Sequence, residues 1–89
     1  MGIVYLVQPA ELVGTRRYKI GCSTKSSLDR IYSGYNLGTR HLCIIKSDVP
    51  YELENKIKSE FNDKFTLISG RETFEGDEHK VINIFLKIV

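Results

Sequence analysis

Four residues of this chain carry groups suited to phosphate chemistry: Tyr5, Tyr18, Arg30 and Glu54. A guanidinium matches phosphate oxygens, a carboxylate can hold Mg²⁺ or Mn²⁺, and a phenol accepts a proton where nearby cations favour its ionised form. Together such groups could cut a phosphodiester bond. Each also has an ordinary explanation, because strand tyrosines usually pack in cores and Glu54 can pair with Lys58 one helical turn later.

Alternating and β-branched residues predict three strands that would position these groups. The strands are expected over Ile3–Gln8, Arg17–Cys22 and His41–Ser47. Pro9, Gly14 and Thr15 interrupt the chain between the first two, which predicts an antiparallel, hairpin-like pair. Tyr5 and Tyr18 then fall on neighbouring strands. Whether both phenols face the same side depends on the register, which the sequence leaves open.

Helices are expected to carry the other two candidates. A Ser-x-x-Asp sequence beginning at Ser26 is typical of a helix start, and the short helix that carries Arg30 should end near Gly34. A second helix should begin near Pro50. Its buried stripe is formed by Leu53, Ile57 and Phe61. Glu54 lies at the border of this stripe and need not be fully exposed.

The remaining residues complete the predicted fold. Residues 69–74 are expected to form a turn with a short extended segment, after which Asp77 caps a last helix. The inward face of that helix consists of Val81, Ile82, Phe85 and Ile88. The predicted fold class is therefore α+β, with a small three-stranded, mainly antiparallel sheet flanked by helices, in one domain over residues 1–89.

Composition narrows the functional classes. The 89 residues are 42% hydrophobic and 27% charged, which is typical of a folded chain. No apolar run approaches the roughly 18 residues that span a bilayer, and the N-terminus lacks the pattern of a secretory signal, so we expect an intracellular protein without membrane contact. Cys22 and Cys43 are expected to form neither a disulfide nor a zinc site, since Cys43 lies in an apolar run.

Charge is distributed unevenly along the chain. Residues 1–47 hold seven lysines and arginines against two acidic residues, whereas residues 48–89 hold six against nine. A basic first half suits a DNA backbone. The residues expected to contact nucleic acid are Arg16, Arg17, Lys25, Arg30 and Arg40.

Several short segments together resemble one nuclease family. They are Gly2-Ile3-Val4-Tyr5, Tyr18-Lys19-Ile20-Gly21, Ser27-Leu28-Asp29-Arg30-Ile31, Glu52-Leu53-Glu54-Asn55-Lys56-Ile57 and Glu72-Thr73-Phe74. In this order and over nearly the whole chain, they resemble the GIY-YIG nuclease superfamily. The similarity is to its minimal single-domain branch, of the type found in phages and large DNA viruses.

The resemblance implies a role for each candidate. Tyr5 and Tyr18 match the two catalytic tyrosines, one of which acts as general base or orients the attacking water. Arg30 matches the arginine that contacts phosphate. Glu54 matches the glutamate that binds a single Mg²⁺ or Mn²⁺ ion. The implied reaction leaves 5′-phosphate and 3′-hydroxyl ends on DNA.

The chain also departs from the family pattern. When Ile20-Gly21 is aligned with the last two letters of YIG, Lys19 takes the place of the tyrosine, so either Tyr18 or Lys19 could face the site. Cys22 stands where the family usually has a lysine after this glycine. Lys25 or Lys19 could replace that lysine, and His41 or Tyr35 could supply another proton-handling group.

These observations predict a divalent-metal-dependent endonuclease acting on DNA through phosphodiester hydrolysis. Two alternatives remain open. The first is a nucleic-acid-binding module of the same fold that has lost turnover, suggested by Cys22 and by the altered YIG segment. The second is a protein-interaction domain in which the tyrosines and Glu54 are structural.

Overall fold

A computed structural model describes residues 2–24, 35–70 and 72–88 of the chain. Its strands and helices, in chain order, are β1 (Gly2–Gln8), the 3₁₀ helix η1 (Ala10–Leu12), β2 (Arg17–Ser23), β3 (Arg40–Ser47), α2 (Pro50–Lys64), β4 (Thr66–Ser69), β5 (Thr73–Glu75) and α3 (Glu78–Ile88). The strands form one antiparallel sheet in the order β3-β1-β2-β5-β4. The predicted helix around Arg30 lies outside the described residues.

The three predicted strands are confirmed to within one residue at each end, and β1 and β2 are antiparallel as expected. The prediction of a three-stranded sheet is wrong, because β5 pairs with β2 and β4 pairs with β5. These two added strands have three and four residues, too few for an alternating pattern to stand out. β5 joins the sheet by pairing with β2, which is far away in sequence, and a local pattern does not reveal such a pairing.

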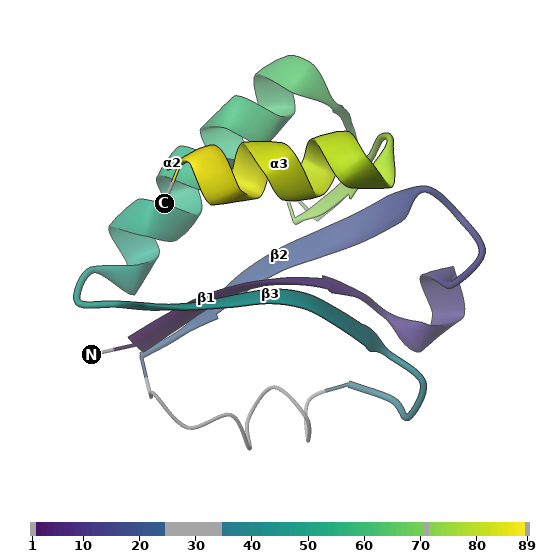
Figure 1. Ribbon diagram of the computed structural model, residues 1–89, viewed down its shortest axis with the longest axis horizontal. Helices are drawn as coiled ribbons and strands as arrows, with labels where there is room; N and C mark the ends of the chain where they lie inside the picture. Colours follow the sequence, from purple (N-terminus) through teal and green to yellow (C-terminus); the bar gives the residue numbers. More distant parts are fainter. Residues whose placement is uncertain (1, 25–34, 71, 89) are drawn as a thin grey trace.

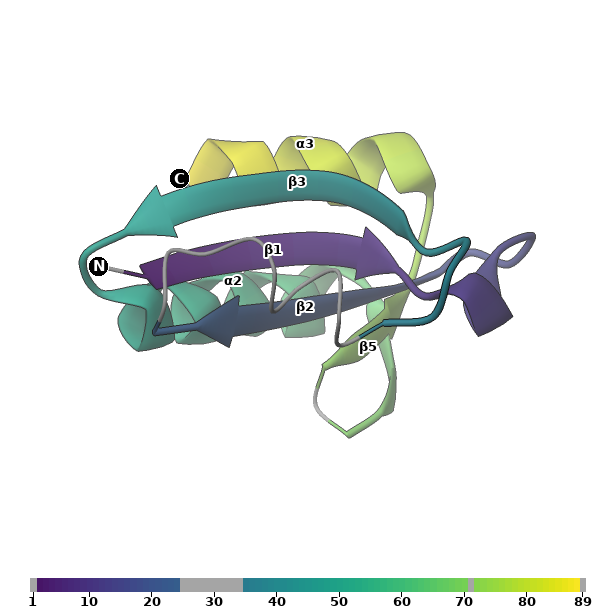
Figure 2. The ribbon, with the colours of Figure 1, turned by 90° about the horizontal axis from the view of Figure 1, so that it is seen from below.

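Both described helices cover the same face of the sheet (Figure 1), and the view from below shows them behind the strands (Figure 2). Apolar side chains of β1, β2, β5 and the helices meet in the core between these layers. Its fully buried members are Val4, Leu6, Tyr18, Ile20, Ile57, Phe61, Phe74, Val81 and Phe85. Ile3 and Val7 point to the opposite face and are also buried, so β1 is buried on both of its faces.

The sequence of α2 explains how it carries a partly buried carboxylate. Pro50 opens the helix, where its missing N–H costs no hydrogen bond, and Glu52 lies in the first turn. Ile57 and Phe61 are buried against the sheet with Leu53 packed beside them, as the spacing of these residues predicted. Glu54 follows Leu53 by one position, and its side chain is only 12% exposed. The expected position of Glu54 at the border of the stripe is confirmed.

A polar cluster ties β3 to the first turn of α3. Arg40 donates hydrogen bonds to both carboxylate oxygens of Glu78, at 2.7 and 3.1 Å, and to Oε1 of Gln8 at 2.8 Å. The Tyr18 hydroxyl donates to Glu78 at 3.0 Å. These bonds, with Arg40 making the largest contribution, hold the pKa of Glu78 below its ordinary value. Burial and the bond to Glu78 raise the pKa of Tyr18.

We expect Glu78→Gln to lower the free energy of unfolding at pH 7, because it removes the negative charge that Arg40 and Tyr18 bind. The loss should be only about 1 kcal/mol, because the cluster is partly exposed to solvent. A carboxyl whose pKa is depressed in the folded state stabilises above its unfolded pKa, and this contribution is lost on acidification. The difference between wild type and variant should therefore shrink as the pH falls below about 4.3. Urea unfolding measured across this pH range tests the expectation.

The matched control is Glu60→Gln, which removes a carboxylate whose partner Lys64 is as exposed as Glu60 itself. It should change stability by less than about 0.5 kcal/mol at either pH. An equal effect of the two substitutions would show that the Glu78 cluster has no special role.

Candidate functional site

The register of β1 and β2 decides which candidate residues share a face of the sheet. Tyr5 lies opposite Gly21, and Val7 lies opposite Lys19. Because paired residues point to the same side and neighbours along a strand alternate, Tyr5 and Lys19 both face away from the helices. Tyr18 points the other way, into the core, and is 3% exposed. The two candidate tyrosines therefore lie on opposite faces.

Gly21 allows the Tyr5 ring to lie across β2. A Cβ atom placed on Gly21 would be 2.5 Å from both Cζ and the hydroxyl oxygen of Tyr5, which is too close for any real side chain. The absence of a side chain at position 21 therefore lets the phenol cross β2.

Tyr35 packs against Tyr5 on the same face. Their ring centroids are 6.1 Å apart and the rings are nearly perpendicular, an edge-to-face contact. The Lys19 ammonium lies 5.6 Å from the centroid of Tyr35. Burial and a hydrogen bond with Tyr5 raise the pKa of Tyr35 far above its ordinary value. The Tyr35 hydroxyl is therefore protonated at neutral pH.

Glu54 approaches β2 from the helix side. Its carboxylate lies 3.4 Å from the Lys58 ammonium and accepts a hydrogen bond from the Cys22 thiol. Burial, followed by the charge of Glu54 and this hydrogen bond, raises the pKa of Cys22 to about 11. At neutral pH Cys22 is thus a protonated thiol that donates a hydrogen bond to Glu54, and not a nucleophilic thiolate.

Glu72 connects the two sides of this strand. Its backbone carbonyl accepts a hydrogen bond from the N–H of Ile20 at 2.9 Å, which fixes it beside β2. Its carboxylate lies 3.4 Å from Lys19 and 4.0 Å from Lys58. Glu54, Lys58, Glu72 and Lys19 thus form a row of alternating charges, here called the edge row. The row runs from α2 past the edge of β2 to the aromatic pair on the other face.

The edge row lies where β5 stops. Within the described strands, β5 pairs with β2 only over Arg17, Tyr18 and Lys19, so the following part of β2 extends beyond it. Cys22 and Gly21 belong to this extension. Groups from both faces of the sheet can therefore meet around this part of β2. A strand paired along both of its edges would keep them apart.

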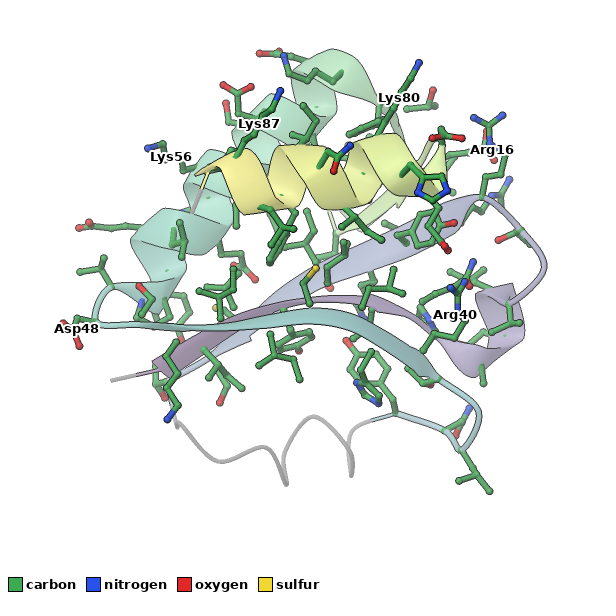
Figure 3. All side chains as sticks on the ribbon, in the orientation of Figure 1. Arg16, Arg40, Asp48, Lys56, Lys80 and Lys87 are labelled. Carbon is green, nitrogen blue, oxygen red and sulfur yellow. The ribbon has the colours of Figure 1, made fainter. Side chains whose placement is uncertain are left out.

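The remaining candidates are more scattered. His41 lies on β3 opposite Val7, in the same cross-strand row as Lys19, and with Tyr35 it lines a hollow of about 430 Å³. Arg16 and Arg40 lie at one end of the molecule (Figure 3). Arg40 forms an ion pair with Glu78. Lys25 and Arg30 lie outside the described residues.

Arg17 forms a cross-strand ion pair with Glu75, at 3.1 Å. Lys56, Lys80 and Lys87 belong to the helix layer (Figure 3), whereas Tyr5 lies on the face of the sheet that points away from the helices. Of the basic residues in the first half of the sequence, Arg17, Lys19 and Arg40 are thus paired with carboxylates in the fold.

Two members of the edge row, Glu72 and Lys58, were not predicted as site residues. Glu72 was noted only within a family-like segment, and Lys58 only as a helical partner of Glu54. The spacing of Glu54 and Lys58 was visible in the sequence, but the approach of Glu72 depends on the pairing of β5 with β2. That pairing was not predicted.

A small α+β domain with a carboxylate, lysines and a tyrosine gathered at a sheet edge suits a protein that acts on phosphate groups. The family model of the T5orf172 domain matches residues 2–89. The chain belongs to the T5orf172 domain family, which is a nuclease-like class. No curated protein and no solved structure matches the chain. The predicted nuclease class is confirmed at this level, and the closer resemblance to GIY-YIG nucleases stays a prediction.

The described part of the chain contains no helix long and apolar enough to cross a membrane.

We expect Gly21→Ala to lower the free energy of unfolding by about 1–3 kcal/mol, because the new methyl group would collide with Tyr5. The cost should largely disappear when Tyr5 is first replaced by leucine. A double-mutant cycle of Gly21→Ala and Tyr5→Leu, followed by urea unfolding, measures this interaction. Equal costs in both backgrounds would mean that the ring does not rest on Gly21.

Proposed function

We propose that this domain is a divalent-metal-dependent endonuclease of the GIY-YIG type, which hydrolyses phosphodiester bonds of DNA at the β2 edge. Membership of a nuclease-like family supports the reaction class. The convergence of Tyr5, Lys19 and Glu54 on the Gly21–Cys22 segment from opposite faces of the sheet is the observation that carries the proposal.

Glu54 is the residue we assign to the metal ion. Mg²⁺ is usually bound by one or two carboxylates, with waters and substrate phosphates completing the octahedron. Glu54 fits this pattern, since its carboxylate is held in place by Cys22 and already faces a positive charge, the Lys58 ammonium. No group of three or more His, Cys, Asp or Glu residues suited to a metal is present among the described residues. When bound, Mg²⁺ or Mn²⁺ would neutralise charge that develops on the phosphate.

Tyr5 is assigned the task of orienting the attacking water. Its hydroxyl is fixed by the hydrogen bond with Tyr35 and by the ring's position over Gly21. A group held in this way loses little further entropy when the reactants assemble. Tyr35 remains protonated and is therefore a supporting group in this proposal.

Lys19 is assigned the place of the second family tyrosine. It faces the same side as Tyr5, whereas Tyr18 is buried on the opposite face and donates a hydrogen bond from its hydroxyl to Glu78. An ammonium beside the phosphate would stabilise the additional negative charge of the transition state. Arg30 keeps the phosphate-binding role that the family resemblance implies.

The proposed partner is the DNA backbone. Arg16, exposed in the loop before β2, and Lys25 remain candidates for phosphate contacts. Arg17 and Arg40 each have a carboxylate partner in the fold. They would have to exchange these partners for phosphates, so we assign them smaller contributions.

We expect Glu54→Gln to reduce nicking of supercoiled plasmid with Mg²⁺ or Mn²⁺ by roughly 10²-fold or more, since the substitution removes the metal-binding charge. Arg30→Ala should cause a comparable loss through the phosphate contact. Glu60→Gln, on the same helix but outside the edge row, is the matched control and should stay within about twofold of wild type. DNA binding without nicking in the wild type would instead select a binding module.

A second pair of variants separates the two tyrosines. Tyr5→Phe should slow nicking by about tenfold or more, because the oriented hydroxyl is lost. Tyr18→Phe should leave the rate per folded molecule within about twofold, although it removes a hydrogen bond to Glu78 and lowers stability by about 1 kcal/mol. Rates and urea unfolding measured on the same preparations test this assignment, and the reverse order of rates would contradict it.

A further inference from the structure

Lys58 is an unusual lysine in this molecule. Its side chain is 19% exposed, and its ammonium lies within 4.0 Å of carboxylate oxygens from both Glu54 and Glu72. The comparable pair on the same helix, Glu60 and Lys64, has both side chains nearly half exposed. Lysine side chains are seldom withdrawn from water unless their charge is paired. Lys58 therefore has a specific place between two carboxylates.

The environment of this ammonium resembles that of a small bound cation. Glu54 faces it from α2, and Glu72 faces it from the residues that lead into β5. The charge of Lys58 also acts on the Cys22 thiol, for which it opposes the pKa increase caused by burial and by Glu54. The positive charge of Lys58 thus interacts with Glu54, Glu72 and Cys22.

We propose that Lys58 is the resident counter-ion of Glu54 and Glu72, and that it leaves Glu54 when a divalent ion binds there. This inference rests on the proposed function, because it takes Glu54 as the metal ligand. An ammonium 3.4 Å from the carboxylate would repel a second cation at the same oxygens. Lys58 must therefore move, and its removal should strengthen metal binding.

A hollow beside Lys58 has room for the displaced ammonium. The Lys58 side chain lines this hollow, which has a volume of about 380 Å³ and lies between α2 and the β4–β5 pair. Three polar residues of α2, Asn55, Ser59 and Asn62, line the same hollow. Their amide and hydroxyl oxygens can accept hydrogen bonds from a displaced ammonium. A flexible four-carbon stem allows this change without movement of the helix.

The test is the binding of Mn²⁺ alone, measured from the electron paramagnetic resonance signal of the free ion. Wild type, Lys58→Met, Lys64→Met and Glu54→Gln are compared after circular dichroism has established that each is folded. Lys64→Met is the matched control, since it removes the same charge from the same helix. We expect Lys58→Met to bind Mn²⁺ about tenfold more tightly than wild type, and Lys64→Met to stay within about twofold.

The outcomes separate this inference from the proposed function. If Glu54→Gln abolishes Mn²⁺ binding but Lys58→Met binds no more tightly than Lys64→Met, the metal site stands and the counter-ion role of Lys58 is wrong. If Mn²⁺ binds wild type and Glu54→Gln equally, both the metal site and this inference fail.

A measurement on the unaltered chain covers the case in which Lys58→Met does not fold. Addition of diamagnetic Mg²⁺ should shift the side-chain NMR signals of Lys58, because its ammonium leaves Glu54. The signals of Lys64 should stay unchanged, since its partner Glu60 lies outside the edge row. Unchanged Lys58 signals at Mg²⁺ saturation would overturn the proposal.

Discussion

The antiparallel register of β1 against β2 is the constraint on which the rest of the structure depends. It sets Tyr5 over Gly21, sends Lys19 to the same face, and directs Tyr18 into the core. A shift by one residue would exchange the two faces of β2 and bury the Lys19 ammonium among apolar side chains. The cost of burying that charge without a partner is large, so the apolar core and the position of Lys19 enforce the same pairing.

The sequence predicted those parts of the fold that depend on local patterns. β1, β2 and β3 were visible as alternating runs, and the stripe of α2 gave the position of Glu54 beside it. The short strands β4 and β5 were not visible as a pair, because neither is long enough to show a period. Their formation depends on Phe74 being buried beside β2, which is a tertiary effect.

The sequence indicated some members of the candidate site but not how they are arranged. Tyr5 and Glu54 were identified from their sequence context, and both lie near the Gly21–Cys22 segment. The choice between Tyr18 and Lys19 could not be made from sequence, since it depends on which face each residue takes. Glu72 joins the group only because β5 pairs with β2, and that pairing was not predicted from the sequence.

The edge row also bears on how the chain reaches its folded state. Many metalloproteins collect carboxylates that repel one another until an ion arrives, and such chains fold only when metal is supplied. Here Lys58 and Lys19 provide the positive charges from within the chain, so Glu54 and Glu72 are neutralised in the fold itself. These two carboxylates therefore need no bound ion to balance their charge in the fold.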